Sequence, residues 1–322
     1  MASVTFKKIN KVYDGKDELN QQIFVTTHSS NISAVAGIDN MFMLAYDRSG
    51  GEAKCKEQSL ASHFEGKDLA KRHLTKFLDA TRSDMLFADK VILVEGIAEK
   101  LLLPKFMEKL GLAYEDEHIS IVEIGGKHFE HFIEIFNGNN VIKKVLCLTD
   151  NDFSWSNSAK LSDYTAHIPG HIGKLREAFP IDNLIIKTQT DGGRTFEEEL
   201  FFANVTNADK AKSLLKIALS DSLHEFISTN GNDFSKWNSS RGNIDGRSKD
   251  KIGSILDLCT VLASNDGTHK EFYERLFFAN LFLCYAQNKK GDVALNILID
   301  DELISRLEIP RYIKEGLEWL LR

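Results

Sequence analysis

Four acidic residues stand where two apolar runs of this sequence end. Glu95 and Glu99 follow one run, and Asp150 and Asp152 follow another further along the chain. Carboxylates gathered at strand ends repel one another. This repulsion destabilises the fold unless a metal ion or a substrate offsets it. Such oxygen ligands suit Mg²⁺ or Mn²⁺, which bind through a few carboxylates and substrate phosphates. The chemistry they serve is phosphodiester displacement, in which two ions stabilise the attacking and leaving oxygens.

The spacing within each pair supports shared chemistry. If Glu95 lies at a strand-to-helix turn, Glu99 at i+4 lies on the first helical turn beside it. Asp150 and Asp152, at i and i+2, would share one face of an extended segment. Thr149 could bind a phosphate, orient a ligand or be an ordinary strand-end threonine. The alternative for each acidic pair is also ordinary: helix-start acids that complement the dipole, and an Asp-rich turn.

The elements that must position these acids alternate between strands and helices from Ala88 onward. Continuous apolar strands separated by helices indicate an α/β fold, with a Rossmann-like, mostly parallel sheet and helices on both faces. In such sheets ligands bind at the carboxyl ends of the strands. The predicted strands cover 90–96, 119–126, 143–152 and 183–190, and the predicted helices cover 97–111 and 128–139.

The flanking regions have a different character. Gln21–Val35 predicts a buried strand, a turn at His28 and a short helix, and Met41–Asp47 predicts another strand. Ser62–Ala88 has the spacing of one or two helices. Residues 205–285 read as helices joined by a polar loop, and the end of the chain is again helical.

Composition bounds the class of protein. A hydrophobic content of 43% in 322 residues is that of an ordinary globular protein. The net charge of −7 argues against a generally basic nucleic-acid binder, but local basic patches remain possible. The four cysteines form no CxxC pair, so we expect reduced thiols, no zinc and a cytoplasmic protein. We expect no membrane association, since there is no signal peptide and no apolar run of spanning length.

The order of the acidic motifs resembles the Toprim fold shared by topoisomerases, primases and several nucleases. The pattern there is a strand–Glu–Gly turn followed by Asp-x-Asp, which Glu95 and the pair Asp150 and Asp152 match. The additional Glu99 gives VEGxxE, which is similar to the OLD (overcoming lysogenization defect) nuclease family and the related Gabija nuclease subunit. The resemblance covers about residues 21–322 and implies a Toprim-type sheet with an inserted or C-terminal helical domain.

Two later stretches extend the resemblance. Thr195–Leu200, TFEEEL, resembles the family's Thr-Leu-Glu-x-Asp-Leu motif and implies Glu197 and Glu199 as further metal ligands, although Asp is more usual at the second position. KKGDVALNIL resembles the Lys-Gly-x-x-Ala motif, whose lysine assists catalysis. Lys290 is the match, and Lys289 is the neighbour that could be confused with it. A cation there can offset charge that develops on a phosphate, whereas the alternative is a solvated lysine at a helix start.

The amino-terminal part resembles a piece of an ABC-type ATPase. IFVTTHSS is similar to the strand and switch histidine of such enzymes, with His28 as the γ-phosphate sensor, but the chain has no GxxxxGK[ST] loop. The resemblance therefore implies a C-terminal portion of a longer ATPase–nuclease, with the ATPase domain before it. The implied domains are an ATPase remnant (1–60), a helical linker (61–87), a Toprim domain (88–204), a helical domain (205–285) and C-terminal helices that return to the Toprim site (286–322).

The expected function is that of a metal-dependent DNA endonuclease with two Mg²⁺ or Mn²⁺ ions, for which Ca²⁺ would be non-productive. Phage defence and a homo-oligomer are further implications of the resemblance. Asn238–Lys251 is predicted as a polar loop that could contact DNA phosphates or simply be solvated. Its candidate DNA-binding residues are Arg241, Arg247, Lys249 and Lys251.

Two alternatives to a nuclease remain open. The first is a primase-like or topoisomerase-like Toprim enzyme. A primase usually brings a zinc module, which these cysteines do not supply, and a topoisomerase needs a nucleophilic tyrosine, for which no tyrosine here has a recognisable context. The second alternative is a non-catalytic DNA-binding scaffold, against which the complete set of acids argues.

Overall fold

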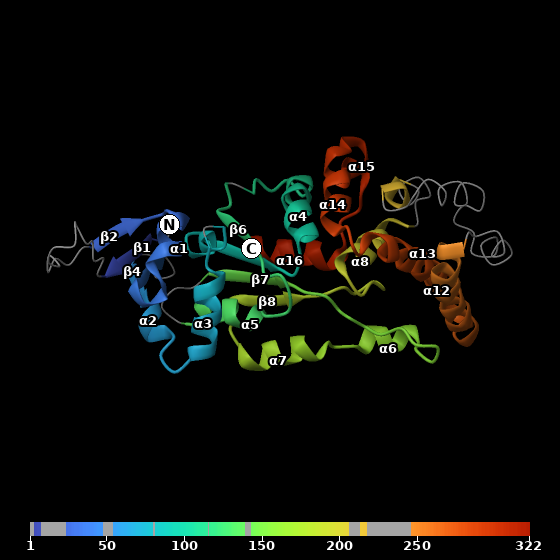
Figure 1. The fold of residues 1–322 in the computed structure, drawn as a ribbon, viewed down its shortest axis with the longest axis horizontal. Coiled ribbons are helices and arrows are strands. Elements are labelled where there is room, and N and C mark those ends of the chain that lie inside the picture. The colour runs from blue at the N-terminus through green and yellow to red at the C-terminus, as the bar shows by residue number, and fades with distance from the viewer. Residues whose placement is uncertain are drawn as a thin grey trace.

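The chain forms two four-stranded sheets followed by a largely helical second half (Figure 1). The computed structural model describes residues 3–7, 24–47, 54–79, 81–114, 116–138, 143–205, 213–217 and 246–322. The second sheet lies near the middle of the molecule, and the helices after it pack on its upper face or extend beyond it (Figure 1).

The second sheet is parallel throughout and has the strand order β6-β5-β7-β8. Each of the four predicted strands is present, shorter than its predicted range, so the predicted α/β class is confirmed. The strands are β5 (Lys90–Val94), β6 (Ile119–Glu123), β7 (Lys144–Leu148) and β8 (Leu184–Lys187).

The central strands are apolar throughout because both of their faces are covered. Along β5, Ile92 and Val94 enter one hydrophobic core, while Val91 and Leu93 enter the other. All four side chains are fully buried. Side chains alternate across a strand, so a strand between two layers of helices needs apolar residues at every position.

Helices cover both faces of this sheet (Figure 1). On one face α16 lies so close to β7 that a Cβ on Gly316 would be 2.9 Å from Leu146 Cδ1. The helices of that core are α4 (Ile97–Lys109), α14 (Lys290–Ile299) and α16 (Arg311–Leu321). Those of the opposite core are α3 (Asp68–Phe77), α5 (Phe129–Ile133) and α7 (Gly170–Ala178).

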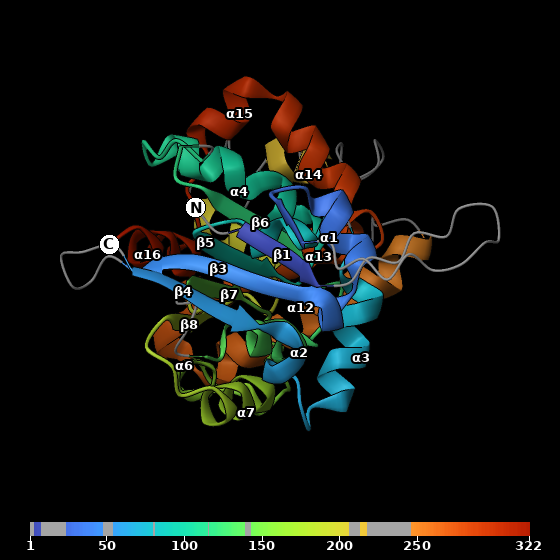
Figure 2. The same cartoon turned by 90° about the vertical axis from the view of Figure 1, so that its left-hand side faces the viewer.

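The first sheet is antiparallel, with the order β2-β1-β3-β4, and stands in front of the parallel sheet in Figure 2. The predicted strands at β2 and β3 are confirmed, but β2 is an edge strand with exposed residues such as Phe24 and is not buried. Met41 and Met43 of β3 share a core with the parallel sheet. The elements of this region are β1 (Ser3–Lys7), β2 (Phe24–Thr27), α1 (Ser30–Ala36), β3 (Met41–Asp47), β4 (Lys54–Ser59) and α2 (Leu60–His63).

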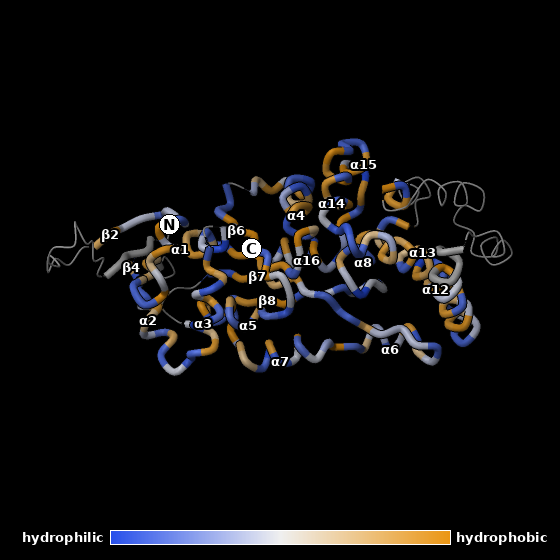
Figure 3. Tube along the Cα trace, viewed as in Figure 1, coloured by the Kyte–Doolittle hydropathy of each residue, from blue (hydrophilic) through white to orange (hydrophobic). Residues whose placement is uncertain are grey.

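The remaining helices extend the core that contains α4, α14 and α16. Hydrophobic residues stand out along α13 and β7 in Figure 3. Phe201 of α8 stacks on Phe282 of α13, with their ring centroids 5.1 Å apart. These helices are α6 (Leu161–Ala166), α8 (Phe196–Asn204), a helical segment at 213–217, α12 (Gly246–Asn265), α13 (Lys270–Ala286) and α15 (Asp301–Arg306). Short 3-10 turns occur at Ile38–Asn40, Ser83–Leu86, Glu134–Phe136 and Gly267–His269.

One loop prediction is wrong in part. The polar segment Asn238–Lys251 was expected to be a loop to its end, but α12 begins at Gly246. The polar residues Arg247 to Lys251 are the first turns of a helix that buries one apolar stripe, formed by Ile252, Leu256, Cys259 and Leu262. In the described part of the chain, no helix has both the length and the hydrophobicity needed to cross a bilayer.

Candidate metal centre

The two acidic motifs meet at the carboxyl edge of the parallel sheet. Glu95 lies in the turn between β5 and α4, and β5 and β7 are hydrogen-bonded neighbours. One carboxylate oxygen of Glu95 accepts hydrogen bonds from the Thr149 hydroxyl and from the backbone N–H of Asp150, each at 3.1 Å. The Thr149 hydroxyl therefore orients the Glu95 carboxylate, which is one of the roles considered for it.

Glu99 lies on the first turn of α4 and is 5% exposed. Gly96, which precedes the helix, leaves room for the Glu99 side chain, because a Cβ at position 96 would be 3.2 Å from Glu99 Oε2. Burial, and then the negative charges of Asp150 and Glu197, raise the pKa of Glu99 well above its usual value. A buried carboxylate beside two others favours either a proton or a cation.

The two aspartates of the Asp-x-Asp motif point into different surroundings. Asp150 is 9% exposed, and its Oδ1 accepts hydrogen bonds from the Gln189 side chain at 3.0 Å and from the Phe196 backbone N–H at 3.1 Å. Asp152 is exposed, with a φ of 54°, so the segment is not extended as its spacing predicted. Its carboxylate forms an ion pair with Lys127.

The late lysine arrives at the cluster from α14. Lys290 Nζ lies 2.9 Å from Glu197 Oε2, and Glu197 is on the first turn of α8. Burial lowers the pKa of Lys290, but Glu197, Asp150 and Glu99 raise it to above its usual value overall. The ion pair with Glu197 is made by Lys290, the first residue of α14, and not by Lys289, which precedes the helix.

The three consecutive glutamates of α8 have three different partners. Glu198 is fully buried and pairs with Arg194 at 2.7 Å. Both oxygens of Glu199 accept backbone N–H groups of the preceding loop, from Thr190, Asp191 and Gly193, at 2.7 to 2.9 Å. Burial raises the pKa of Glu199 to about 7. These contacts favour a structural role for Glu199, whose function as a ligand stays a prediction, whereas Glu197 faces the cluster.

Four residues near the acids were not anticipated from the sequence. Gln189, two residues beyond β8, donates to Asp150 and accepts from the backbone N–H of Asn151 at 2.6 Å. Lys127 follows β6 and pairs with Asp152. His171 contacts the Thr149 hydroxyl at 3.0 Å, and Tyr312 lies 3.4 Å from Gln189. A strand-end position was the only available indication for Gln189 and Lys127, and none existed for the other two.

The donors at this edge fit a hard divalent cation. Glu99, Asp150 and Glu197 are buried oxygen donors, and one ammonium group, that of Lys290, lies among them. The second oxygen of Glu197, Oε1, is buried and has no hydrogen-bond partner. Buried carboxylate oxygens are normally satisfied, and an all-oxygen donor set is the one that Mg²⁺ and Mn²⁺ prefer.

Residues 86–152, which carry Glu95, Glu99, Asp150 and Asp152, match the family described as the overcoming lysogenization defect protein-like Toprim domain. The chain contains an OLD-like Toprim domain. Its four-stranded parallel sheet and the additional C-terminal helices agree with the fold expected from the acidic motifs.

The curated relatives extend the similarity beyond the Toprim domain. The chain is 32% identical over 92 residues to Endonuclease GajA of Bacillus cereus strain VD045, which is 29% of this chain and 16% of that protein. It is 24% identical over 339 aligned positions to Endonuclease GajA of strain HuB5-5, which is 94% of this chain and 43% of that protein. The chain thus spans less than half of the length of these relatives.

Solved structures similar to this chain include C-terminal regions of two OLD proteins. That of Burkholderia pseudomallei has 18% sequence identity and a TM-score of 0.38, and covers 73% of this chain and 97% of that one. That of Xanthomonas campestris pv. campestris has 16% identity and a TM-score of 0.40, and covers 74% and 94%. These scores are too low to bear on the details of the site.

The remaining predicted site residues lie away from the Toprim acids or outside the described residues. His28 is exposed after β2, and its ring centroid lies 5.8 Å from that of Phe87. Arg241 lies outside the described residues. Arg247, Lys249 and Lys251 belong to the start of α12, but their side chains are outside what the structure describes. Their contact with DNA stays a prediction.

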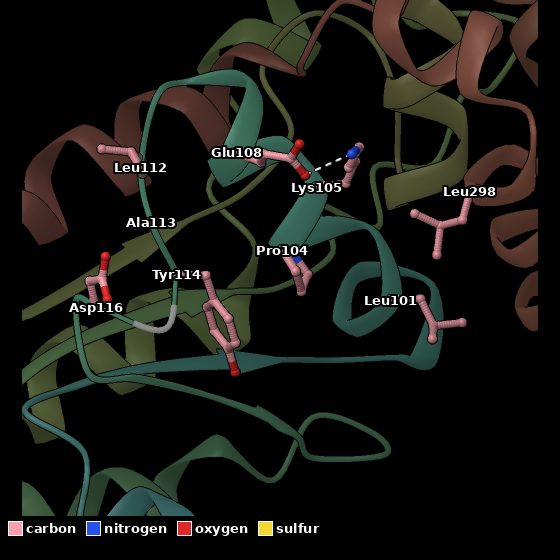
Figure 4. Close-up of a pocket in the computed structure, with 9 residues that line it drawn as sticks. All are labelled: Leu101, Pro104, Lys105, Glu108, Leu112, Ala113, Tyr114, Asp116 and Leu298. Atoms are coloured by element: carbon pink, nitrogen blue, oxygen red, sulfur yellow. Dashed lines mark hydrogen bonds and ion pairs between the residues drawn. The ribbon is translucent and has the colours of Figure 1, made fainter.

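A hollow of about 460 Å³ lies beside α4, away from the Toprim acids (Figure 4). Leu101, Pro104 and Tyr114 line it together with Leu298 of α14, and the ion pair between Lys105 and Glu108 stands beside it. None of the predicted metal ligands lines this hollow. It therefore takes no part in the chemistry considered for the strand ends.

Proposed function

We propose that this chain is the nuclease portion of an OLD-like ATPase–nuclease, which cleaves DNA phosphodiester bonds with Mg²⁺ or Mn²⁺. The observation that carries the proposal is the group of buried carboxylates at the Toprim strand ends. Glu99, Asp150 and Glu197 share one neighbouring ammonium group, and one buried oxygen of Glu197 has no partner. Such a cluster takes up either protons or further cations, and two divalent ions would provide the positive charge.

The ligands would be divided between two positions of the cluster. Glu95, Glu99, Asp150 and Glu197 are the nearest candidates, with Asp152 available if its carboxylate leaves Lys127. Two bound ions supply an activated water and stabilise the leaving oxygen. Thr149 and the backbone of Asp150 hold the Glu95 carboxylate in a fixed orientation, and Gln189 does the same for Asp150.

The two lysines would act on the DNA backbone. Lys290 has 35% of its side chain exposed, and its raised pKa keeps it protonated beside Glu197. A protonated amine in that position can offset negative charge that develops on a phosphate during displacement. Lys127 is 46% exposed and pairs with Asp152, so it can exchange that carboxylate for a DNA phosphate. These local cations would allow a chain with a net charge of −7 to bind DNA.

The proposal also covers the rest of the chain. Residues 1–60 would be the end of an ATPase domain with His28 as its switch residue, and 61–87 a linker to a Toprim domain at 88–204. Residues 205–285 would form a helical domain, and 286–322 would return Lys290 to the site. A nucleic acid is the proposed substrate because both curated relatives are named endonucleases, and DNA is proposed because the acidic motifs resemble those of the OLD nuclease family. Cytoplasmic localisation, assembly as a homo-oligomer and a role in phage defence belong to the same proposal.

A plasmid-nicking assay tests the proposal. Supercoiled DNA should be nicked with Mg²⁺ or Mn²⁺ but not with Ca²⁺, and Glu95→Gln should abolish nicking. Glu108→Gln is the matched control, because Glu108 is an exposed acid of α4 outside the cluster and should behave as wild type. Equal nicking by Glu95→Gln and wild type would refute the proposal. A covalent protein–DNA adduct would indicate a topoisomerase instead, and no metal binding by calorimetry would indicate a scaffold.

A further inference from the structure

Three histidines and a glutamate meet on the face of the parallel sheet opposite α4 and α14. His73 belongs to α3, while His128, Glu130 and His131 stand at the start of α5, and the two helices lie side by side (Figure 1). One carboxylate oxygen of Glu130 lies 3.7 Å from His128 Nδ1 and 3.5 Å from His131 Nε2. The donor atoms of these three residues all lie within 4.8 Å of one another.

The fourth member, His73, packs its ring against two of them. The ring centroid of His73 lies 4.1 Å from that of His131 and 5.7 Å from that of His128. Within the described residues, the ion pairs of His128, Glu130 and His131 are with one another and not with the Toprim carboxylates. The proposed nuclease chemistry does not use these residues. Their chemistry also differs, because imidazole nitrogens suit Zn²⁺ and similar transition metals, whereas the Toprim donors are all oxygens.

We propose that His128, Glu130 and His131, with His73 as the fourth ligand, bind a Zn²⁺ ion at a site separate from the Toprim acids. The earlier expectation of no zinc considered the cysteines alone, and this site contains none. A tetrahedral ion with Zn–N bonds of about 2.0–2.1 Å holds its donors about 3.3 Å apart. The distances of 3.5 and 3.7 Å within the cluster are near that spacing. A small rotation of exposed side chains would close the remaining difference.

The burial of the four residues suits a site that is partly built and reachable. His131 is 9% exposed, and burial lowers its pKa, which favours the neutral ring that binds a metal ion. His128 and Glu130 are 63% and 42% exposed, and so are free to turn towards a shared ion. His73 lines an open hollow of about 290 Å³ with Arg72 and Lys76, through which an ion can enter from solvent.

An ion at this site would also act on the neighbouring Toprim edge. It would tie α3, which precedes the Toprim domain, to α5 within it. His128 directly follows Lys127, which pairs with Asp152. Zn²⁺ would therefore hold the loop that presents Lys127, and binding should raise the unfolding temperature of the chain, because an ion that binds the native state stabilises it.

Calorimetry on the full, chelator-treated chain tests the proposal, with Zn²⁺ titrated in saturating Mg²⁺ so that the Toprim carboxylates are occupied. We expect one Zn²⁺ per chain. His128→Gln and His73→Gln should each weaken binding roughly tenfold or more, since even the outer partners of a metal ion contribute about 10–100-fold. His128 is exposed, so its substitution should leave the fold intact. His269→Gln, a change at a distant exposed histidine, is the control and should bind as wild type.

The absorption spectrum of the Co²⁺-substituted chain identifies the ligands. Nitrogen and oxygen donors give d–d bands without a thiolate charge-transfer band, which would appear if the exposed Cys55 bound the ion. The proposal is overturned by any of three results: no Zn²⁺ uptake in saturating Mg²⁺, wild-type affinity in both His128→Gln and His73→Gln, or a thiolate band. None of these results depends on nuclease activity, so the two proposals can fail independently.

Discussion

The three consecutive glutamates of α8 should respond differently to one and the same substitution. Glu197, Glu198 and Glu199 are all buried, and Glu→Gln changes the charge of each without changing its size. Glu197 faces the Toprim acids and Lys290, Glu198 pairs with Arg194, and Glu199 accepts backbone N–H groups. A set of three isosteric variants therefore separates chemistry from structure within a single helical turn.

The expected magnitudes follow from what each carboxylate leaves behind. Glu198→Gln weakens the pair with Arg194, at a cost of about 1–3 kcal/mol, towards the lower end because the Arg194 side chain is 30% exposed. Glu199→Gln turns an amide NH₂ against a backbone N–H and should also cost about 1–3 kcal/mol. In Glu197→Gln the free energy of unfolding of the metal-free chain should change by less than about 1 kcal/mol, because Lys290 keeps the charges of Asp150 and Glu99 nearby.

Mg²⁺ affinity and nicking should be affected in the opposite order to stability. Glu197→Gln should lower Mg²⁺ affinity and nicking by about 100-fold or more, since a direct ligand contributes at least as much as an outer partner. Glu198→Gln and Glu199→Gln should retain nicking at a temperature where they are folded. Their unfolding temperatures should fall by roughly 2–4 °C per kcal/mol.

Thermal unfolding with and without Mg²⁺, calorimetry and plasmid nicking measure these effects on the same samples. The reasoning is refuted if Glu197→Gln keeps wild-type Mg²⁺ affinity and nicking. It is also refuted for Glu199 if Glu199→Gln abolishes nicking at an unchanged unfolding temperature. That result would make Glu199 a metal ligand, as the motif resemblance implied.

Three further predictions follow from single contacts. Lys290→Met should slow nicking by roughly 10²–10³-fold while Mg²⁺ still binds by calorimetry, and Lys289→Met should nick as wild type; equal rates in both would contradict the role of Lys290. Gly193→Ala should cost about 1–3 kcal/mol in denaturant unfolding, because its Cβ would lie 2.5 Å from the Glu199 nitrogen; wild-type stability would contradict this clash. Burial lowers the pKa of Lys143 from 10.5 to about 7. The unfolded chain therefore binds the extra proton between these values, so stability should rise with pH from about 7 to 10.5, more in wild type than in Lys143→Met; parallel pH profiles would contradict it.

Much of the candidate site follows from local patterns. The runs before Glu95 and Asp150 are apolar at every position, which indicates strands buried on both faces. Parallel strands end at one edge, so the meeting of these acids could be expected from the order of strands and helices alone. The position of Glu99 on the first turn of α4 was equally predictable, because a helical pattern begins directly after the strand-end Glu95 and Gly96.

Other features depend on contacts between segments that are distant in sequence. The turn at Asp152, with its φ of 54°, separates it from Asp150, and its backbone N–H bonds to the Arg194 carbonyl. The start of α12 at Gly246 escaped prediction because polar first turns look like a loop until the packed apolar residues behind them are considered. Gln189 reaches Asp150 because β8 lies beside β7.

The sequence by itself determined the α/β class, the strand ends that carry Glu95 and Asp150, and the presence of a lysine motif near the end of the chain. Only the tertiary structure decided that Glu197 and not its two neighbours faces Lys290, and that His73 meets His131. The physical reason is the range of the forces involved. Periodicity and turn chemistry act within a few residues, whereas the partner of each buried charge depends on how α8, α14 and the sheet pack together.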